Sequence, residues 1–470
     1  MQKTKIIATL GPACRDLKII KNMIKSGLSV FRINTSHLKQ ASEVKSIIRM
    51  IRRESKKLDR SISVMMDLGG PKIRVKLLPN TQRIIIKKGT IYTLGTKNCD
   101  ILINQNIKIN DFKKNAKVKI DDGKIVFKYI KNTDDKLSLK ALTFGEITAN
   151  KGVNFPGIKL NLPAVTDEDK KNIKTGIDLN VDWFAQSFVR NASNIIPINR
   201  ILEKSNIKVP IIAKIETTES IDNLDSILKT YDGVLIARGD LGVEMGLSNL
   251  PKLQKQIINK CIYYKIPSIV ATQMLETMIS HESPTRAEVN DVANAIYDGV
   301  DAIMLSAETA IGKYPIKAVE MMSNISQNIE SDIDDSNFNR NIINTMSSTI
   351  KNNYLAICHA ACSISKNLAI KIIVVLTDSG KTAIQMAQFR PNAIIVAITP
   401  NIRTCNLLSI IWGVVPIHKK QPKNINSLYN FVNRVLLKKG LIKSGQNFLI
   451  TSGILKLKNS TNMLQIYRSK

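Results

Sequence analysis

The stretch from Pro210 to Asp240 decides the fold of this chain of 470 residues. It begins with PIIAKIE (210–216) and ends with GVLIARGD (233–240), so an apolar run that ends in charged residues occurs twice. Continuous apolar runs of this length predict parallel strands that are buried on both faces, and the segment Ser220–Lys229 between them predicts the crossover helix. The two strands are therefore expected to be neighbours in one sheet.

Charged side chains follow both predicted strands. Parallel neighbours end at the same edge of a sheet, so Glu216 and Asp240 are expected to converge, with Lys214 on the same strand face as Glu216. Two carboxylates beside an ammonium group suggest Mg²⁺ and a phosphate. The alternative is that these charges only begin solvated loops.

Strand-like runs recur along the chain at intervals that hold helices. Eight such runs precede residue 306, and they are Thr4–Leu10, Val30–Ile33, Ser63–Asp67, Asp182–Val189, Ile211–Glu216, Gly233–Ala237, Ser268–Thr272 and Asp301–Leu305. This alternation predicts an α/β protein with a (β/α)₈ TIM barrel. Chemistry in such barrels lies at the carboxyl ends of the strands, and the polar residues found there are Arg32, Asn34, Asp67, Lys214, Glu216, Asp240, Thr272, Gln273, Ser306 and Glu308.

Two further domains are expected. Between the third and fourth runs the helix pattern gives way to short strands and turns, which predicts an inserted β-barrel domain placed to act as a lid. After a polar link near Ser331–Asn337, a new alternation predicts a C-terminal α/β domain. The expected boundaries are 1–70 and 164–338 for the barrel, 71–163 for the lid and 339–470 for the C-terminal domain.

The loop Thr377–Thr382 of the C-terminal domain ends like a Walker A loop, but Val375 stands where that loop has its first glycine. A hydroxyl-rich turn that enters a helix can still bind phosphate through backbone N–H groups, so the loop predicts a site for an anionic effector. An ordinary capped helix start is the alternative.

The charge of +31 raises nucleic-acid binding as a rival function. Lysines are spread along the whole chain with no basic run interleaved with aromatic residues, so we expect no nucleic-acid partner. No stretch reaches the roughly 18 apolar residues of a membrane span, and a strand-like run begins almost at Met1, so no membrane association and a cytoplasmic location are expected.

Several motifs, in this order, resemble those of pyruvate kinases, and bacterial members in particular. They are FRINTSH (31–37), DLGGPKIR (67–74), NKGVN (150–154), AKIE (213–216), ARGDLG (237–242), ATQML (271–275) and PTRAE (284–288). The resemblance covers nearly the whole chain. It implies transfer of a phosphoryl group from phosphoenolpyruvate to ADP, giving pyruvate and ATP in the last step of glycolysis.

The resemblance also implies roles for individual residues. Lys214, Arg32 and Thr272 would be catalytic; Arg32, Gly239, Asp240 and Thr272 would bind substrate; Asn34, Ser36, His37, Arg74 and Lys151 would contact the nucleotide. Mg²⁺ would bind Glu216 and Asp240, and K⁺ would bind Asn34, Ser36, Asp67 and Leu68. The effector loop would comprise Thr377, Ser379, Gly380, Lys381 and Thr382. A sugar phosphate or AMP as effector and a homotetramer are also expected.

Two positions depart from the family pattern. Thr35 stands where the family usually has Phe, which affects the packing of the cation loop but replaces no ligand. Lys72 stands where K⁺-dependent members carry Glu, and its ammonium would bring positive charge to the K⁺ site, so the sequence predicts activity largely independent of K⁺. The alternative is that Lys72 points to solvent at the lid hinge.

The fold alone would also suit a Mg²⁺-dependent barrel lyase or aldolase that acts through a pyruvate enolate. Such an enzyme needs no ADP site, so Arg74, Lys151 and the lid favour the kinase.

Overall fold

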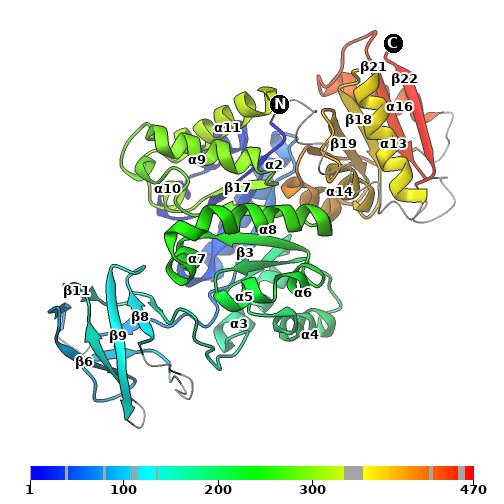
Figure 1. The fold of residues 1–470 in the computed structure, drawn as a ribbon. Helices are drawn as coiled ribbons and strands as arrows, with labels where there is room; N and C mark the ends of the chain where they lie inside the picture. Colours follow the sequence, from blue (N-terminus) through cyan, green and yellow to red (C-terminus); the bar gives the residue numbers. More distant parts are fainter. Residues whose placement is uncertain are drawn as a thin grey trace. The chain divides into compact units, whose positions relative to one another are not determined.

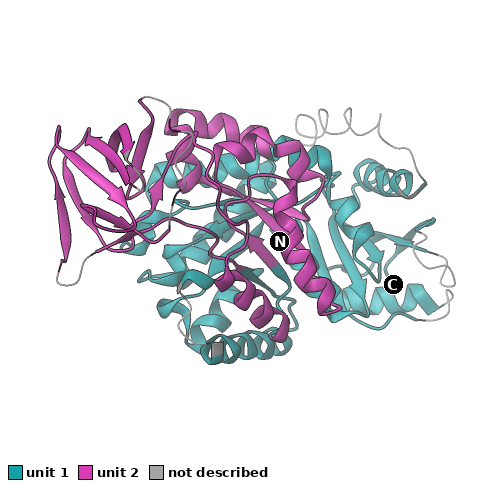
Figure 2. Ribbon diagram, turned by 90° about the horizontal axis from the view of Figure 1, so that it is seen from below, with its two compact units in different colours: residues 1–66, 179–183, 258–470 teal, residues 67–178, 184–257 magenta. Residues whose placement is uncertain are grey.

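The structure is a computed structural model that describes residues 2–37, 41–77, 81–105, 107, 112, 115–133, 136–332, 353–422, 427–453 and 461–470 (Figure 1). The chain divides into two compact units: Met1–Met66, Leu179–Trp183 and Ile258–Lys470 form the first, and Asp67–Asp178 and Phe184–Ile257 form the second (Figure 2). The expected domain boundary at 338 lies outside the described residues.

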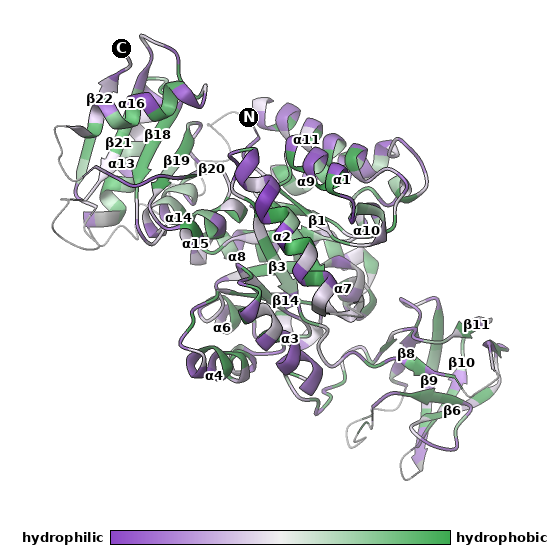
Figure 3. Ribbon diagram, turned by 180° about the vertical axis from the view of Figure 1, so that it is seen from behind, coloured by the Kyte–Doolittle hydropathy of each residue, from purple (hydrophilic) through white to green (hydrophobic). Residues whose placement is uncertain are grey.

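Eight parallel strands close into the predicted barrel, in the order β1-β17-β16-β15-β14-β13-β3-β2. Their bounds are β1 (Lys5–Thr9), β2 (Val30–Asn34), β3 (Ser63–Asp67), β13 (Trp183–Gln186), β14 (Ile211–Ile215), β15 (Gly233–Ala237), β16 (Ser268–Ala271) and β17 (Ala302–Leu305). As predicted, β14 pairs with β15, with Ile212 opposite Gly233. Figure 3 shows β3 in the hydrophobic colour, as expected for a strand covered on both faces.

Helices follow the barrel strands. They are α1 (Leu17–Lys25), α2 (Ala41–Lys57), α3 (Asp167–Asp178), α4 (Ile196–Lys204), α5 (Thr218–Asp222), α6 (Leu224–Leu228), α7 (Arg238–Met245), α8 (Leu250–Tyr264), α9 (Arg286–Tyr297), α10 (Ala307–Ala310) and α11 (Pro315–Asp332). Local sequence explains several starts: Asp16 accepts hydrogen bonds from the backbone N–H groups of Lys18 and Ile19, and Thr285 and Glu288 form a capping box. None of the described helices is long and apolar enough to cross a membrane.

The crossover between β14 and β15 differs from the single helix predicted for Ser220–Lys229. Two short helices, α5 and α6, meet at Asn223. The side-chain amide of Asn223 donates to the carbonyl oxygens of Glu219 and Arg190, both at 3.0 Å. Asparagine competes in this way with helical hydrogen bonding, which explains the break.

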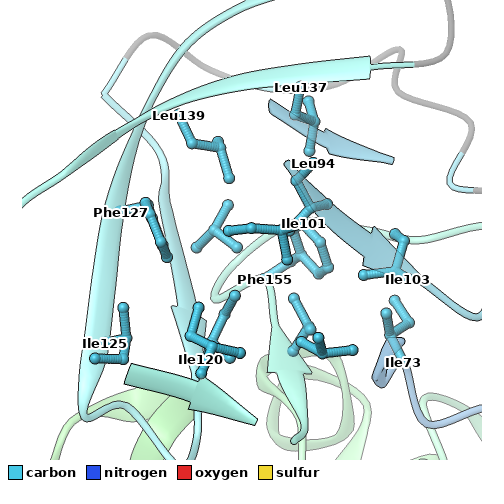
Figure 4. Close-up of a cluster of buried hydrophobic side chains, with 14 of the residues drawn as sticks. Ile73, Leu94, Ile101, Ile103, Ile120, Ile125, Phe127, Leu137, Leu139 and Phe155 are labelled. Atoms are coloured by element: carbon cyan, nitrogen blue, oxygen red, sulfur yellow. The ribbon is translucent and has the colours of Figure 1, made fainter. Parts of the chain in front are cut away.

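The inserted segment is a β domain, as predicted. Its strands are β4 (Val75–Lys76), β5 (Arg83–Ile86), β6 (Ile91–Gly95), β7 (Ile101–Ile103), β8 (Lys117–Ile120), β9 (Ile125–Thr133), β10 (Lys136–Ala141), β11 (Gly145–Thr148) and β12 (Val153–Asn154). Seven of them form one sheet that runs from β12 to β4. These two end strands also meet: Val75 N–H donates to Lys151 O, and Val153 N–H donates to Ile73 O, each at 2.9 Å. The sheet therefore closes on itself around an apolar core that includes Phe127 and Phe155 (Figure 4).

The C-terminal α/β domain has a five-stranded sheet in the order β20-β19-β18-β21-β22. Its elements are α13 (Asn353–Asn367), β18 (Ile372–Leu376), α14 (Lys381–Ala387), β19 (Ile394–Thr399), α15 (Ile402–Leu407), β20 (Val414–His418), α16 (Leu428–Lys438), β21 (Asn447–Ser452) and β22 (Met463–Arg468). The strand-like runs from which the sequence predicts this domain, Lys371–Leu376, Ile394–Ile398, Val414–Ile417 and Asn447–Thr451, correspond to four of these strands, and β22 was missed. It runs antiparallel to β21 at the sheet edge, where its side chains are only partly buried.

Candidate active site

In the first unit, Arg32 lies within one barrel strand and Thr272 directly follows another. Arg32 lies in β2 with its side chain buried, and one guanidinium nitrogen donates to the Thr9 hydroxyl at 3.0 Å. Thr272 follows β16 and, like Gln273, has a positive φ, of 73° and 54° respectively. Two successive non-glycine residues in the left-handed region carry conformational strain of the kind found at functional sites.

The short helix η2 (Thr35–His37) follows β2 and carries other expected contacts. The side-chain oxygen of Asn34 accepts the N–H of Ser36 at 3.2 Å, which holds both polar side chains in one turn. Thr35, the departure from the family pattern, is buried. The side chain of His37 lies outside the described part of the chain.

The centre of the second unit's site is the ammonium group of Lys214. Its Nζ lies 2.7 Å from Ser187 Oγ, 3.0 Å from Glu216 Oε1 and 3.3 Å from Asp67 Oδ1. The side chains of Asp67 and Glu216 are each only 1% exposed, so the charge of Lys214 is what offsets two desolvated carboxylates. These residues come from the ends of β3, β13 and β14, as the predicted barrel requires.

Glu216 is held at both carboxylate oxygens. Oε1 faces Lys214, and Oε2 accepts the backbone N–H of Phe188 at 2.7 Å. Phe188 lies in the left-handed region, with a φ of 54°. Burial raises the pKa of Glu216, the nearby charge of Lys214 lowers it, and that of Asp240 raises it. Glu216 and Asp240 therefore interact, as their predicted convergence requires.

Asp240 lies in the first turn of α7, directly after β15. Its Oδ1 is 2.8 Å from Lys72 Nζ, and Lys72 also lies 5.7 Å from the centre of the Phe188 ring. Gly239 and Asp240 thus lie at the start of a helix, where the positive end of the helix dipole suits an anion.

Two predicted nucleotide contacts, Arg74 and Lys151, lie in adjacent backbone segments where the lid begins and ends. Arg74 pairs with Gly152 in an isolated bridge and donates to the carbonyl of Asn150 at 3.0 Å. Lys151 Nζ lies 2.8 Å from Asp121 Oδ1. Leu68, a predicted K⁺ ligand, is buried, and its N–H donates to Ala185 O at 2.9 Å. Its carbonyl oxygen is the atom that could bind a cation.

The predicted effector loop lies between β18 and α14 of the C-terminal domain. The Thr377 hydroxyl accepts the N–H of Gly380 at 2.9 Å, and Gly380 has a φ of 82° directly before α14. The Thr382 hydroxyl lies 2.9 Å from that of Thr461. A Cβ at position 380 would lie 3.1 Å from Leu408, so glycine is required there.

The oxygen ligands of the site suit a divalent cation that also binds oxygen atoms of a substrate. Among the described residues, no group of three or more His, Cys, Asp or Glu side chains could hold a metal ion. Glu216 and Asp240 supply two carboxylates, and Mg²⁺ commonly binds one or two carboxylates together with phosphate oxygens and water. The donor set therefore suits Mg²⁺ bound together with a phosphorylated substrate.

Sequence reasoning did not identify Ser187, Phe188 and Asp121, which contact Lys214, Glu216 and Lys151 respectively. Ser187 could have been found, because it directly follows the fourth barrel strand, where the other strands carry polar site residues. Phe188 acts through its backbone, and the side chain in the sequence gives no sign of that.

The chain resembles known proteins over nearly its whole length. Residues 1–319 match the family model described as pyruvate kinase, barrel domain, and residues 355–467 match that described as pyruvate kinase, alpha/beta domain. A pyruvate kinase of Staphylococcus epidermidis is 38% identical over 99% of this chain and 80% of its own length. A pyruvate kinase of Thermotoga maritima is 37% identical over the full length of both chains, and pyruvate kinase 2 of Synechocystis is 36% identical over 99% of this chain and 79% of its own.

Proposed function

The chain belongs to the pyruvate kinase family, and on that premise we propose that the residues around Lys214 carry out its phosphotransferase reaction. That reaction moves the phosphoryl group of phosphoenolpyruvate to ADP and gives pyruvate and ATP. This assignment of residues rests on the position of the Lys214 ammonium, which lies within 3.3 Å of side-chain oxygens of Asp67, Glu216 and Ser187.

The proposed role of Lys214 is electrostatic. A phosphoryl group in transfer spreads negative charge over its equatorial oxygens, and a fixed positive charge stabilises it without reorganisation. Three oxygen partners hold the Lys214 ammonium in place. Arg32, which is buried and donates a hydrogen bond to Thr9, would supply a second fixed positive charge to the transferred phosphoryl group.

Mg²⁺ is the divalent cation that the family generally needs, and Glu216 and Asp240 would hold it. When bound, it would neutralise charge on the phosphate oxygens. The N–H groups of Gly239 and Asp240 at the start of α7 would bind the acidic groups of phosphoenolpyruvate. Thr272 would lie near the carbon that takes up a proton when the enolate becomes pyruvate.

K⁺ is also generally needed in this family, and Asn34, Ser36, Asp67 and the carbonyl of Leu68 would form its site. We propose that Lys72 makes this protein largely independent of K⁺, because it adds a fixed ammonium beside Asp240.

Arg74 and Lys151 would bind the phosphates of ADP, together with Asn34, Ser36 and His37. The backbone bridge between Arg74 and Gly152 supports this role, because it brings together the segments that carry the two cations where the lid begins and ends. Closure of the lid would then complete the nucleotide site.

Three further properties are proposed from the family resemblance. A phosphorylated effector would bind Thr377, Ser379, Gly380, Lys381 and Thr382; the protein would be a homotetramer; and it would act in the cytoplasm without a nucleic-acid partner. The hydroxyl-rich turn that ends at the left-handed Gly380, directly before α14, supports the effector site, because such a turn at a helix start can bind phosphate.

The experiment is phosphorus NMR of the purified protein with phosphoenolpyruvate, ADP and Mg²⁺. We expect the signals of ATP to grow as that of phosphoenolpyruvate falls, with no net change without ADP. Consumption of phosphoenolpyruvate that does not depend on ADP and forms no ATP would instead indicate a barrel lyase.

A further inference from the structure

Helix α7 is held by residues of the lid and its hinge at three points. Lys72, in the outgoing hinge, is 2.8 Å from Asp240 Oδ1. Lys119, in lid strand β8, donates its Nζ to the carbonyl of Val243 at 2.5 Å. The Glu244 carboxylate accepts hydrogen bonds from the Asn154 side chain and from the Gly157 backbone N–H.

The contact of Glu244 joins two parts of the proposed active site. Asn154 ends β12, three residues after the nucleotide candidate Lys151. Glu244 lies four residues after Asp240, which places both on the same face of α7, one turn apart. The hydrogen bond thus links the segment that follows the proposed nucleotide contact Lys151 to the helix that would hold the phosphate and Mg²⁺.

Polar contacts matter at this junction because packing is incomplete. A partly open pocket of about 120 Å³ lies beside it and is lined by residues that include Asn154, Gly157 and Glu244. The pKa of Glu244 is raised to about 7 overall, because burial and the charge of Asp240 raise it by more than the two hydrogen bonds and the charge of Lys119 lower it. A partly desolvated carboxylate is costly unless its hydrogen bonds are made, so Glu244 has a strong requirement for Asn154 and Gly157.

We propose that Glu244 is a positioning residue for phosphoryl transfer, which holds the returning hinge strand at a set distance from the helix that carries Gly239 and Asp240. It touches no reacting atom. Its loss would leave phosphoenolpyruvate binding in place and slow transfer to ADP. The proposal rests on the function proposed above.

The test exchanges, in two steps, the amide and the carboxylate that form the hydrogen bond between residues 154 and 244. In Asn154→Asp, two carboxylates face each other at pH 8, and we expect kcat to fall about tenfold and KM for ADP to rise. Affinity for phosphoenolpyruvate, measured by equilibrium fluorescence, is expected to stay within about twofold. In the double variant Asn154→Asp, Glu244→Gln, the amide and the carboxylate have exchanged places, so the hydrogen bond can form again. We expect kcat to recover to within about threefold of the parent.

Glu146→Gln is the matched control, since Glu146 is an exposed lid carboxylate paired only with Arg83 among the contacts described, and its kinetics should equal the parent's. Parental kcat in Asn154→Asp, or no recovery in the double variant, would overturn the proposal. If Asn154→Asp does not fold by circular dichroism, Asn154→Leu replaces it, and its parental kcat would overturn the proposal equally. Failure here with ATP formation intact in the parent would leave the proposed function standing.

Discussion

Lys72 and Asp240 form an ion pair of 2.8 Å between the lid hinge and the first turn of α7. The Lys72 side chain is 22% exposed and also lies over the Phe188 ring, so it does not simply point to solvent. Its charge therefore lies beside a proposed Mg²⁺ ligand. Lys72 therefore already supplies a positive charge to the proposed active site of the kind that a monovalent cation would add.

The first prediction concerns K⁺. We expect the turnover of the parent protein to change less than about tenfold, or 1.4 kcal/mol, when tetramethylammonium replaces K⁺ at constant ionic strength and Mg²⁺. Lys72→Glu should become K⁺-dependent, because it replaces the ammonium by a carboxylate beside Asp240. Lys88→Glu, an exposed lid position, is the control and should stay independent of K⁺. A larger loss in the parent would make the site of Asn34, Ser36 and Asp67 a required K⁺ site.

The second prediction concerns the effector loop. Ser379→Glu places a carboxylate beside Gly380, and like charge should repel a phosphate group there. We expect activation by phosphorylated sugars or AMP to disappear while turnover without effector stays as in the parent. Ser444→Glu, in an exposed turn of the same domain, should keep normal activation. An unchanged activation curve for Ser379→Glu would move the effector site elsewhere.

The third prediction follows from the raised pKa of Glu244, about 7 in the folded protein against an ordinary value of 4.5. Between these values the folded protein keeps a proton that the unfolded chain has lost, so this group makes the free energy of unfolding fall as pH rises from about 5 to about 7. Glu244→Gln removes that contribution. Urea unfolding at several pH values should therefore show the parent losing stability relative to the variant over this range, and parallel pH profiles would contradict the assignment.

Much of the fold could be predicted because the barrel repeats one physical pattern. A buried run that ends in charge, as in 210–216 and 233–240, indicates both a parallel strand and its position at the carboxyl rim. Strand direction then brings Lys214, Glu216 and Asp67 together without further information. The lid could be recognised by the loss of the helix pattern.

Other features could not be predicted, because they depend on contacts between distant segments or on single side chains. The break between α5 and α6 depends on the amide of Asn223, and a helical pattern of apolar residues continues across it. The link from Asn154 to Glu244 requires that the hinge return beside α7. Strand β22 lies at a sheet edge, where partial burial weakens the alternation that would mark it.

The most direct test of the account replaces Lys214 by Met, with Lys204→Met on the exposed surface of α4 as the matched control. Both purified proteins are assayed for ATP formation from phosphoenolpyruvate and ADP, with circular dichroism to establish that they are folded. We expect Lys214→Met to lose about 10²–10³ in turnover, because a fixed cation facing the transferred group is gone, and Lys204→Met to match the parent. Near-parental turnover in folded Lys214→Met would contradict the account.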